Sequence, residues 1–299
     1  MVDPATATGS RRPVDQRALA QVLARLRRAP AAPWLHGEVA RRMAEKLQAI
    51  RVQPSVVVDW WPSLGASTEA LRKAYPKARH VGVEPEAKAV ESPWWSPGRW
   101  SGRRAGAVAE SALAPGGAQL VWANMVLHFV ADPQAQLQAW RDALAVDGFL
   151  MFSTLGPGTL ASLAALYRAQ GWPPPAAAFV DMHDLGDMLV HAGFADPVMD
   201  QETITLNWRD PDALLAELRA LGGNAHPSRH AGLRTPRWRR QLVEALSRAA
   251  GAEGRPALDF EVVYGHAFRP QPRLRVAPET QVPIDALRAS LRSRGTPRS

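Results

Sequence analysis

The chain contains no cysteine among its 299 residues. Disulfide bonds, thiolate-bound metals and a cysteine nucleophile are therefore excluded, and the absence fits a reducing compartment. The sequence also lacks any apolar run near the roughly 20 residues that a membrane-spanning helix needs. Its start, "MVDPATATGSRRPVD", has no apolar core of the kind found in signal peptides. We therefore expect a soluble, cytoplasmic protein with no membrane partner.

Acidic residues are scarce at the carboxyl-terminal end, where most of the net charge of +8 is found. From position 269 to 299 there are seven arginines against two acidic residues. Such a segment buries too little apolar surface to order itself, so residues 271–299 are predicted to be a disordered basic tail, and residues 1–14 a disordered start. No zinc-finger spacing, aromatic RNA-binding signature or helix-turn-helix pattern accompanies the charge, which argues against a nucleic-acid partner.

Helical and strand periods alternate along the rest of the chain. The predicted helices are 15–30, 34–50, 67–76, 132–148, 158–170, 184–192, 211–221 and 236–250. The predicted strands are 55–61, 80–85, a segment beginning at 118, 149–155, 204–209 and 260–269. Between positions 86 and 104 both signals fade, and we expect a loop with a short helix.

This alternation predicts a parallel sheet with right-handed crossovers, closed by antiparallel strands at one edge. The sequence thus predicts a single α/β domain over 15–270, with a helical insert around 158–250.

Three stretches are expected at the carboxyl ends of parallel strands, where open sheets of this kind bind ligands. They are Asp59 to Ser67, Glu84 and the segment around Asn124. An acid that ends the second strand can accept both hydroxyls of a ribose, although a helix cap or a solvated turn residue is an equal alternative for Glu84. The turn after Asp59 keeps only Gly65 of the several glycines typical of a cofactor loop. Because bulky side chains disfavour a positive φ, Trp60 and Trp61 predict a wider turn with an ordinary backbone.

The segments "FSTLGPGTL" and "FVDMHDLGDMLVHAGFADPVMD" are the most distinctive in the chain. Together with "ALLAELRALGGNAHPSRHAGLRTPRW" and "FEVVYGHAFRP", they closely resemble the malonyl-[acyl-carrier-protein] O-methyltransferases of biotin synthesis. The resemblance is dense over about residues 118–270 and loose over 34–90. It implies a Rossmann-like class I methyltransferase fold, with a seven-stranded, mostly parallel sheet, helices on both faces, and S-adenosylmethionine as methyl donor.

The resemblance also implies which residues bind this cofactor. Asp59 and Trp60 begin the cofactor loop, Gly65 is its last glycine, Glu84 holds the adenosine ribose, and Asn124 lies beside the methionine moiety. Three features depart from the family pattern: Trp61 and Ser63 stand where glycines are usual, an acid that contacts the adenine is missing near position 106, and a tyrosine-aspartate pair is missing before position 34.

Candidate substrate residues come from the other half of the chain. Arginine holds carboxylates and phosphates with a planar fork, so Arg229 or Arg234 is expected to bind the malonyl carboxylate or the pantetheine phosphate. His128 is expected at the mouth of the crevice, with capping of the next helix as the alternative. Ser153 is expected to contact the thioester arm or, alternatively, to satisfy backbone groups. The histidines show no metal-ligand spacing, so no metal is predicted.

These observations predict methylation of the free carboxylate of a malonyl thioester on acyl carrier protein. Because that carrier is acidic, a basic face over Arg234 to Arg240 is its expected docking site. One alternative is a non-catalytic relative that keeps the carrier-binding half but has lost the methyl donor, as the three departures allow. Another is a nucleic-acid binder that works through the tail at 271–299, which would bind in a strongly salt-dependent manner.

Overall fold

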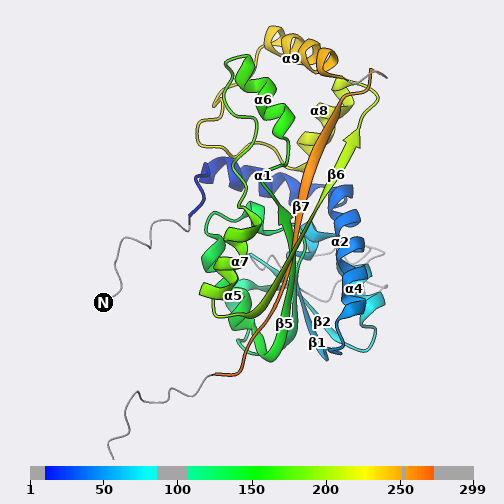
Figure 1. Ribbon diagram of the computed structural model, residues 1–299, viewed down its shortest axis with the longest axis vertical. Helices are drawn as coiled ribbons and strands as arrows, with labels where there is room; N and C mark the ends of the chain where they lie inside the picture. The colour runs from blue at the N-terminus through cyan, green and yellow to red at the C-terminus, as the bar shows by residue number, and fades with distance from the viewer. Residues whose placement is uncertain (1–10, 86–106, 251–253, 273–299) are drawn as a thin grey trace, which may run out of the picture.

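The computed structural model describes residues 11–85, 107–250 and 254–272 (Figure 1). The predicted loop at 86–104 lies outside the described residues, as do nearly all of the predicted tail and most of the predicted disordered start. In the described part of the chain, no helix has both the length and the apolarity needed to cross a membrane.

One seven-stranded sheet forms the centre of the fold, in the order β3-β2-β1-β4-β5-β7-β6. The strands are β1 (Val56–Trp60), β2 (Arg79–Glu84), β3 (Val108–Ala109), β4 (Ala118–Ala123), β5 (Leu144–Leu155), β6 (Ala195–Asn207) and β7 (Ala257–Phe268). Strands β1 to β5 pair in parallel, and β7 runs antiparallel to both of its neighbours. The predicted mostly parallel sheet with antiparallel strands at one edge is therefore confirmed.

Nine α-helices are described, together with several single 3₁₀ turns. They are α1 (Gln16–Arg28), α2 (Trp34–Lys46), α3 (Pro62–Gly65), α4 (Thr68–Ala74), α5 (Pro133–Ala143), α6 (Ala161–Ala169), α7 (Met182–His191), α8 (Pro211–Leu221) and α9 (Pro236–Ala249). The helix predicted from 184 begins two residues earlier because Asp181 caps it, accepting a hydrogen bond from the backbone N–H of His183 (2.8 Å). The strand predicted at 204–209 is longer and begins at 195, because it pairs with β7 over most of that strand's length.

Helices cover both faces of the sheet, as predicted. The apolar side chains of α5 and α7 pack on one face, together with those of α1. Those of α2 and α4 pack on the other face, in a cluster that continues into α6, α8 and α9. In β1 the alternation of strand side chains sends Val58 and Trp60 to the first cluster and Val57 to the second.

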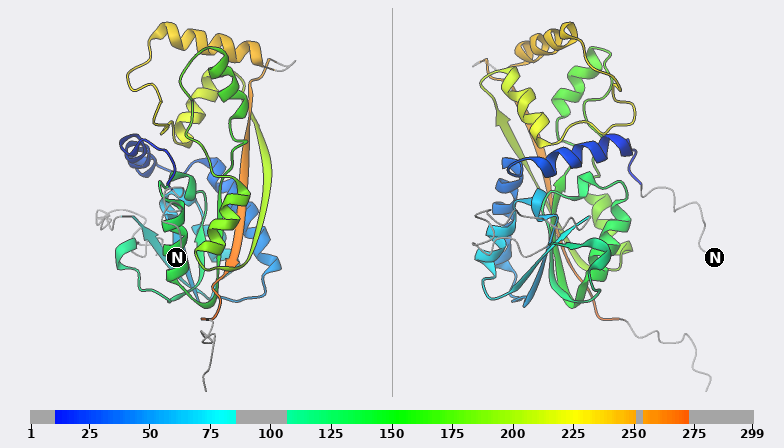
Figure 2. Two further views of the ribbon diagram at one scale, coloured as in Figure 1. Left: turned by 60° about the vertical axis from the view of Figure 1, so that its left-hand side comes forward. Right: turned by 180° about the vertical axis from the view of Figure 1, so that it is seen from behind.

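Helices α6, α8 and α9 form a separate layer, here called the helical lobe, beyond the carboxyl ends of the parallel strands (Figure 1). Figure 2 shows α1 running between this lobe and the sheet. The long strands β6 and β7 reach from the sheet into the lobe. The fold thus encloses the carboxyl edge of the sheet, where a ligand is expected, between the strands and a helical cover.

Candidate active site

The carboxyl ends of β1, β2 and β4 bring three of the predicted residues to one edge of the sheet. Asp59 pairs in register with Gly82 of β2 and Trp122 of β4. Glu84 is the last residue of β2, and Asn124 follows β4 directly. These three positions lie at the edge where open parallel sheets bind their ligands, and we call the space beyond these strand ends the crevice.

Helix α3, a single turn, lies across this crevice and is held from both sides. On one side the backbone N–H of Trp61 donates to the carbonyl of Val83 in β2 (2.7 Å). On the other side the Asn124 amide donates to the carbonyl of Gly65 (2.5 Å). Trp61 and Leu64 are only 6% and 3% exposed. Their side chains therefore fill space between the strand ends and the helices that cover them.

The backbone of this turn differs from the prediction. Trp61 and Ala66 adopt φ values of 57° and 53°, and Met125, on the opposite side of the crevice, adopts 55°. The expectation of an ordinary backbone at Trp61 is therefore wrong: the chain keeps a conformation suited to glycine without having the glycines. A left-handed conformation costs a non-glycine residue about 1–2 kcal/mol. Such strain persists only where surrounding contacts hold it.

The Trp61 indole is held by a residue that the sequence prediction missed. Its Nε1–H donates to Oε1 of Glu110, immediately after β3 (2.5 Å). The guanidinium of Arg27, in the last turn of α1, lies 5.6 Å from the centre of the indole ring. The family pattern places an acid near position 106, and Glu110 is four residues further on. An acid directly after the third strand was the signal that could have identified it.

Glu84 and Asn124 are already hydrogen bonded to the chain. Oε1 of Glu84 accepts a bond from the backbone N–H of Ser63 in α3 (2.9 Å). The Asn124 amide donates to the carbonyl of His36 (2.7 Å) as well as to Gly65, and its Oδ1 accepts from the Ser153 hydroxyl (2.7 Å). Asn124 and Ser153 are fully buried. Two roles were predicted for Ser153, contact with the thioester arm or hydrogen bonds to groups within the protein. The structure shows hydrogen bonds within the protein.

Asp59 is the exception among the crevice residues. It is 4% exposed, and Oδ2 accepts a long hydrogen bond from Thr68 (3.3 Å). Its Oδ1 is buried and has no partner among the described residues. Burial, with a smaller contribution from Glu84, raises the pKa of Asp59 to about 8. With this pKa the carboxyl group is mostly protonated at neutral pH, and a positively charged group bound beside the unpartnered oxygen would favour its ionised form.

His128 lies partly buried in the turn after β4, next to the buried side chain of His36. The ring centres of His128 and His36 are 6.2 Å apart. Burial lowers the pKa of His36 to about 4, and burial together with His36 and Arg12 lowers the pKa of His128. Both rings are therefore neutral at physiological pH. The alternative of His128 as a helix cap is wrong, because Asp132 caps α5 by accepting from the backbone N–H of Ala135 (3.0 Å).

Trp60 does not lie in the crevice with its neighbour. Its indole is 2% exposed and packs edge-on against Trp140 of α5, with ring centres 6.2 Å apart. The Trp60 side chain is part of the hydrophobic core between the sheet and α5. Of the two tryptophans, only Trp61 spans the strand ends.

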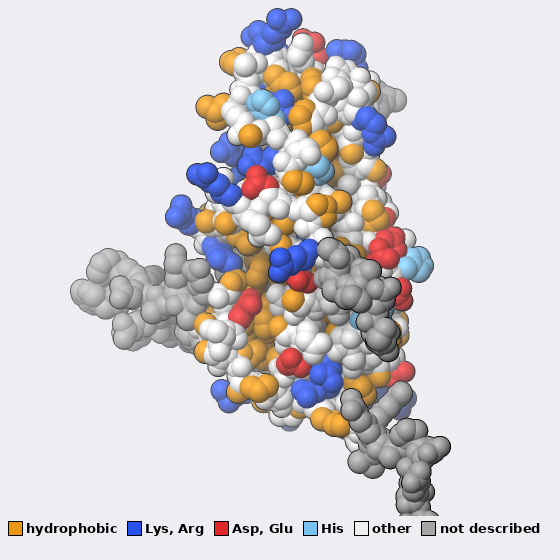
Figure 3. Space-filling model, turned by 90° about the vertical axis from the view of Figure 1, so that its left-hand side faces the viewer, with side chains coloured by type: hydrophobic (Ala, Val, Ile, Leu, Met, Phe, Trp, Pro, Cys, Tyr) orange, Lys and Arg blue, Asp and Glu red, His pale blue; other side chains and the backbone are white. Residues whose placement is uncertain are grey.

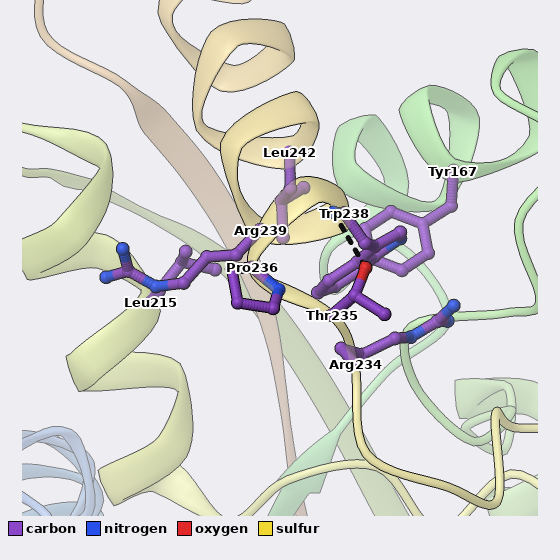
Figure 4. A pocket seen from close by; sticks show the side chains of 8 residues that line it. All are labelled: Tyr167, Leu215, Arg234, Thr235, Pro236, Trp238, Arg239 and Leu242. Carbon is purple, nitrogen blue, oxygen red and sulfur yellow. Dashed lines mark hydrogen bonds between the residues drawn. The ribbon is translucent and has the colours of Figure 1, made fainter.

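The two candidate arginines occupy different surroundings. Arg229 donates through Nη2 and Nε to Oδ2 of Asp15, the cap of α1 (2.9 and 3.1 Å). Arg234 instead stacks on Trp238, with its guanidinium carbon 4.3 Å from the ring centre. It lines a pocket of about 360 Å³ within the helical lobe (Figure 4). The lining residues are Tyr167, Leu215, Arg234, Thr235, Pro236, Trp238, Arg239 and Leu242.

The structure thus divides the predicted site residues into two groups. Asp59, Gly65, Glu84, Asn124 and Ser153 surround the crevice at the sheet edge. Arg229 and Arg234 belong to the segment between α8 and α9, above that edge. Within the described ranges, no three histidine or acidic side chains come together as a metal site would require.

The strand order, with a crevice where β1, β2 and β4 end, defines a class I methyltransferase fold. The same fold is found in the YcgJ protein of Bacillus subtilis, which aligns with a TM-score of 0.51 and 10% identity over 77% of this chain and 98% of that chain. A Bacillus halodurans C-125 protein classed as a methyltransferase aligns with a TM-score of 0.51 and 12% identity, over 77% and 99% of the two chains. These likenesses concern the fold alone.

Sequence comparison identifies the family. The chain belongs to the malonyl-[acyl-carrier protein] O-methyltransferases, which are enzymes. It is 34% identical to the relative from Gallionella capsiferriformans over 274 residues, which are 87% of this chain and 93% of the relative. It is 37% identical to the relative from Laribacter hongkongensis, over 81% and 84% of the two chains. No protein-family model matches the chain.

The crevice residues can be tested against S-adenosylmethionine, the donor that the resemblance implies. The unpartnered Oδ1 of Asp59 suits a cation. In the rest of the crevice, the backbone N–H of Ser63 takes one of the two carboxylate oxygens of Glu84, and the amide of Asn124 donates both of its hydrogens within the protein. A Cβ added at Gly65 would lie 3.2 Å from the Asn124 carbonyl, so α3 and β4 are already in contact. The buried side chains of Trp61 and Leu64 fill the space between α3 and the strand ends, so the donor fits only once α3 moves.

Proposed function

We propose that the protein methylates the free carboxylate of a malonyl thioester on acyl carrier protein, with S-adenosylmethionine as methyl donor, as an early step of biotin synthesis in the cytoplasm. The observation that carries this proposal is the 34% identity to the Gallionella malonyl-[acyl-carrier protein] O-methyltransferase, which extends over 93% of that relative. Because the matched 87% of this chain includes both the sheet and the helical lobe, it supports the whole reaction and not the fold alone.

The proposed reaction needs little acid–base catalysis. A malonyl carboxylate is ionised at neutral pH, so its attack on a methyl group needs no general base. The two histidines nearest the crevice, the buried His36 and the partly buried His128, have lowered pKa values and are neutral, which agrees with a site that does not move protons. The protein then has to position the reactants and exclude water.

Asp59 and Glu84 are the residues that we assign to the donor once α3 has moved. The donor is a sulfonium cation with a ribose, and both of its recognised features suit carboxylates: positive charge near Asp59 and hydroxyl groups near Glu84. The unpartnered Oδ1 of Asp59 supports this assignment. Ser153 supports the site indirectly, because its hydroxyl holds Asn124 in place.

Arg234 is the residue that we assign to the anionic part of the substrate, in preference to Arg229. Asp15 already neutralises Arg229, whereas no carboxylate pairs with Arg234 among the described residues. The pocket beside Arg234 has apolar walls from Tyr167, Trp238 and Leu242. Such walls suit the pantetheine arm, and the arginine suits its phosphate or the malonyl carboxylate.

Helix α9 is the proposed docking site for the carrier. Its first turns carry Arg237, Arg239 and Arg240, and its first turn has no acidic residue. Of these, Arg239 is paired with Asp212 of α8 (2.6 Å). Figure 3 shows basic side chains on the upper part of the molecule, where the helical lobe lies, and further down the same face. An acidic carrier protein would be attracted to this surface by charge complementarity.

The direct test is a methyl-transfer assay with methyl-labelled S-adenosylmethionine. We expect label to enter malonyl-acyl carrier protein and to be released by mild alkali, as a methyl ester is. Acetyl-acyl carrier protein, which has no free carboxylate, is the matched control and should remain unlabelled. Malonyl-coenzyme A added in parallel measures the contribution of the carrier. Absence of label from both malonyl thioesters would refute the proposal.

A further inference from the structure

We infer that Trp61 and Glu110 form a latch that holds α3 across the donor crevice and thereby sets the affinity for the methyl donor. The inference rests on the proposed function, because it concerns the donor of that reaction. It identifies two positioning residues that the resemblance does not include.

The latch joins the ends of three neighbouring strands. Trp61 follows β1, its backbone N–H bonds to Val83 near the end of β2, and its indole bonds to Glu110 directly after β3. Arg27 of α1 covers the indole from above. The first residue of the turn is thus tied down by contacts from β2, the end of β3 and α1.

The other end of α3 is held against β4 and α2. The carbonyl of Leu64 lies 2.8 Å from Nδ1 of His36 in α2. The carbonyl of Gly65 accepts from the Asn124 amide, and the Leu64 side chain is buried in the core. With both ends fixed, the short helix closes the edge where β1, β2 and β4 meet.

The closed latch uses some of the groups that a nucleoside would need. The Glu84 carboxylate binds the backbone N–H of Ser63. The Asn124 amide donates hydrogen bonds to the carbonyls of His36 and Gly65, and its Oδ1 accepts one from Ser153. Among these three crevice side chains, only Asp59 retains a buried oxygen without a partner in the described part of the chain. Donor binding therefore competes with α3 for one oxygen of Glu84 and for the space that the buried side chains of Trp61 and Leu64 fill.

The closed turn is strained, which makes it able to open. Trp61 and Ala66 hold left-handed backbone conformations that residues other than glycine disfavour. The indole contacts with Glu110 and Arg27 compensate for this strain in the closed state. Loss of the indole hydrogen bond should leave the strain uncompensated and shift the turn towards an open conformation.

The effect on affinity results from a population shift. If only the open form binds the donor, the apparent dissociation constant is the intrinsic one divided by the open fraction. A change that weakens the latch raises that fraction and tightens binding, even though it adds no contact with the donor. Removal of a residue that contacts the donor would instead weaken binding.

Two single variants remove the same hydrogen bond from its two ends. Glu110→Ala removes the acceptor, and Trp61→Phe removes the indole N–H while leaving a ring in the core. We expect each to bind S-adenosylmethionine and S-adenosylhomocysteine at least tenfold more tightly than the unchanged protein, by titration calorimetry. The double variant should bind no more than about twofold more tightly than the better single variant, since both changes break one bond. Glu69→Ala, on the exposed first turn of α4, is the control and should bind as the unchanged protein does.

The outcomes separate the latch from the proposed function. If Glu110→Ala and Trp61→Phe bind the nucleosides as the unchanged protein does, or more weakly, the latch is refuted while methyl transfer stands. If all the proteins are folded by circular dichroism and none binds either nucleoside, both the latch and the methyl donor are refuted. Hydrogen exchange at the amides of Leu64 and Gly65, which should become faster in both variants, reports the opening without any ligand.

Discussion

The hydroxyl of Ser153 lies 2.7 Å from Oδ1 of Asn124, and neither side chain is reached by solvent. The same hydroxyl accepts from the backbone N–H of Met125 (3.0 Å). One serine on β5 therefore holds both the side chain of Asn124 and the strained turn that comes after it. It connects β5 to the crevice.

This relationship predicts that Ser153→Ala destabilises the protein. The change leaves the Asn124 oxygen buried without its donor, which costs about 1–3 kcal/mol. Urea unfolding should show this loss as a lower midpoint with an unchanged slope. Ser228→Ala, at an exposed position, serves as the control and should leave the midpoint unaltered. A Ser153→Ala protein of normal stability but with no turnover would instead indicate direct contact with the substrate.

The raised pKa of Asp59 predicts an unusual dependence of stability on pH. The carboxyl has a pKa of about 8 in the folded protein, because of burial, and an ordinary value when unfolded. Its contribution to stability is therefore complete below about pH 4 and is lost as the pH rises through 8. Over that interval the free energy of unfolding should fall by about 1.4 kcal/mol per pH unit from this group.

The measurement is urea unfolding of the unchanged protein and of Asp59→Asn at pH 5, 7 and 9. The stability of Asp59→Asn relative to the unchanged protein should rise with pH, since the amide has no proton to lose. A constant difference between the two proteins across this range would show that Asp59 titrates normally.

The basic start of α9 predicts a specific effect on carrier recognition. Arg237→Glu together with Arg240→Glu should raise KM for malonyl-acyl carrier protein by about tenfold or more and leave kcat nearly unchanged, because charge complementarity acts on encounter. Turnover of malonyl-coenzyme A should change much less, which makes that substrate the internal control. Equal effects on both substrates would place these arginines at the thioester and not at a docking surface.

Much of the fold could be predicted from the sequence because local patterns determine it. The three valines before Asp59 predict a buried strand, and the strand is present. The helical spacing of apolar residues placed α8 at its observed bounds and α9 to within one residue. The carboxyl-edge rule brought Asp59, Glu84 and Asn124 together without any knowledge of contacts.

The contacts within the site could not be predicted in the same way. The bond between Trp61 and Glu110 joins residues 49 positions apart, and the pair between Arg229 and Asp15 spans 214 positions. No local pattern distinguishes an arginine paired with a helix cap from one that lines a pocket. The pairing of β7 between β5 and β6 is likewise a long-range choice that extended β6 beyond its predicted limits.

By itself, the sequence determined which segments are buried strands and amphipathic helices, because burial imposes periods of 2 and 3.6 residues on neighbouring positions. It also determined that carboxylate, amide and hydroxyl groups end the strands that meet at one edge. Only the tertiary structure decided that Trp61 keeps a left-handed turn and that α3 closes the crevice. The reason is physical: a strained backbone is stable only when contacts from distant parts of the chain compensate for its cost.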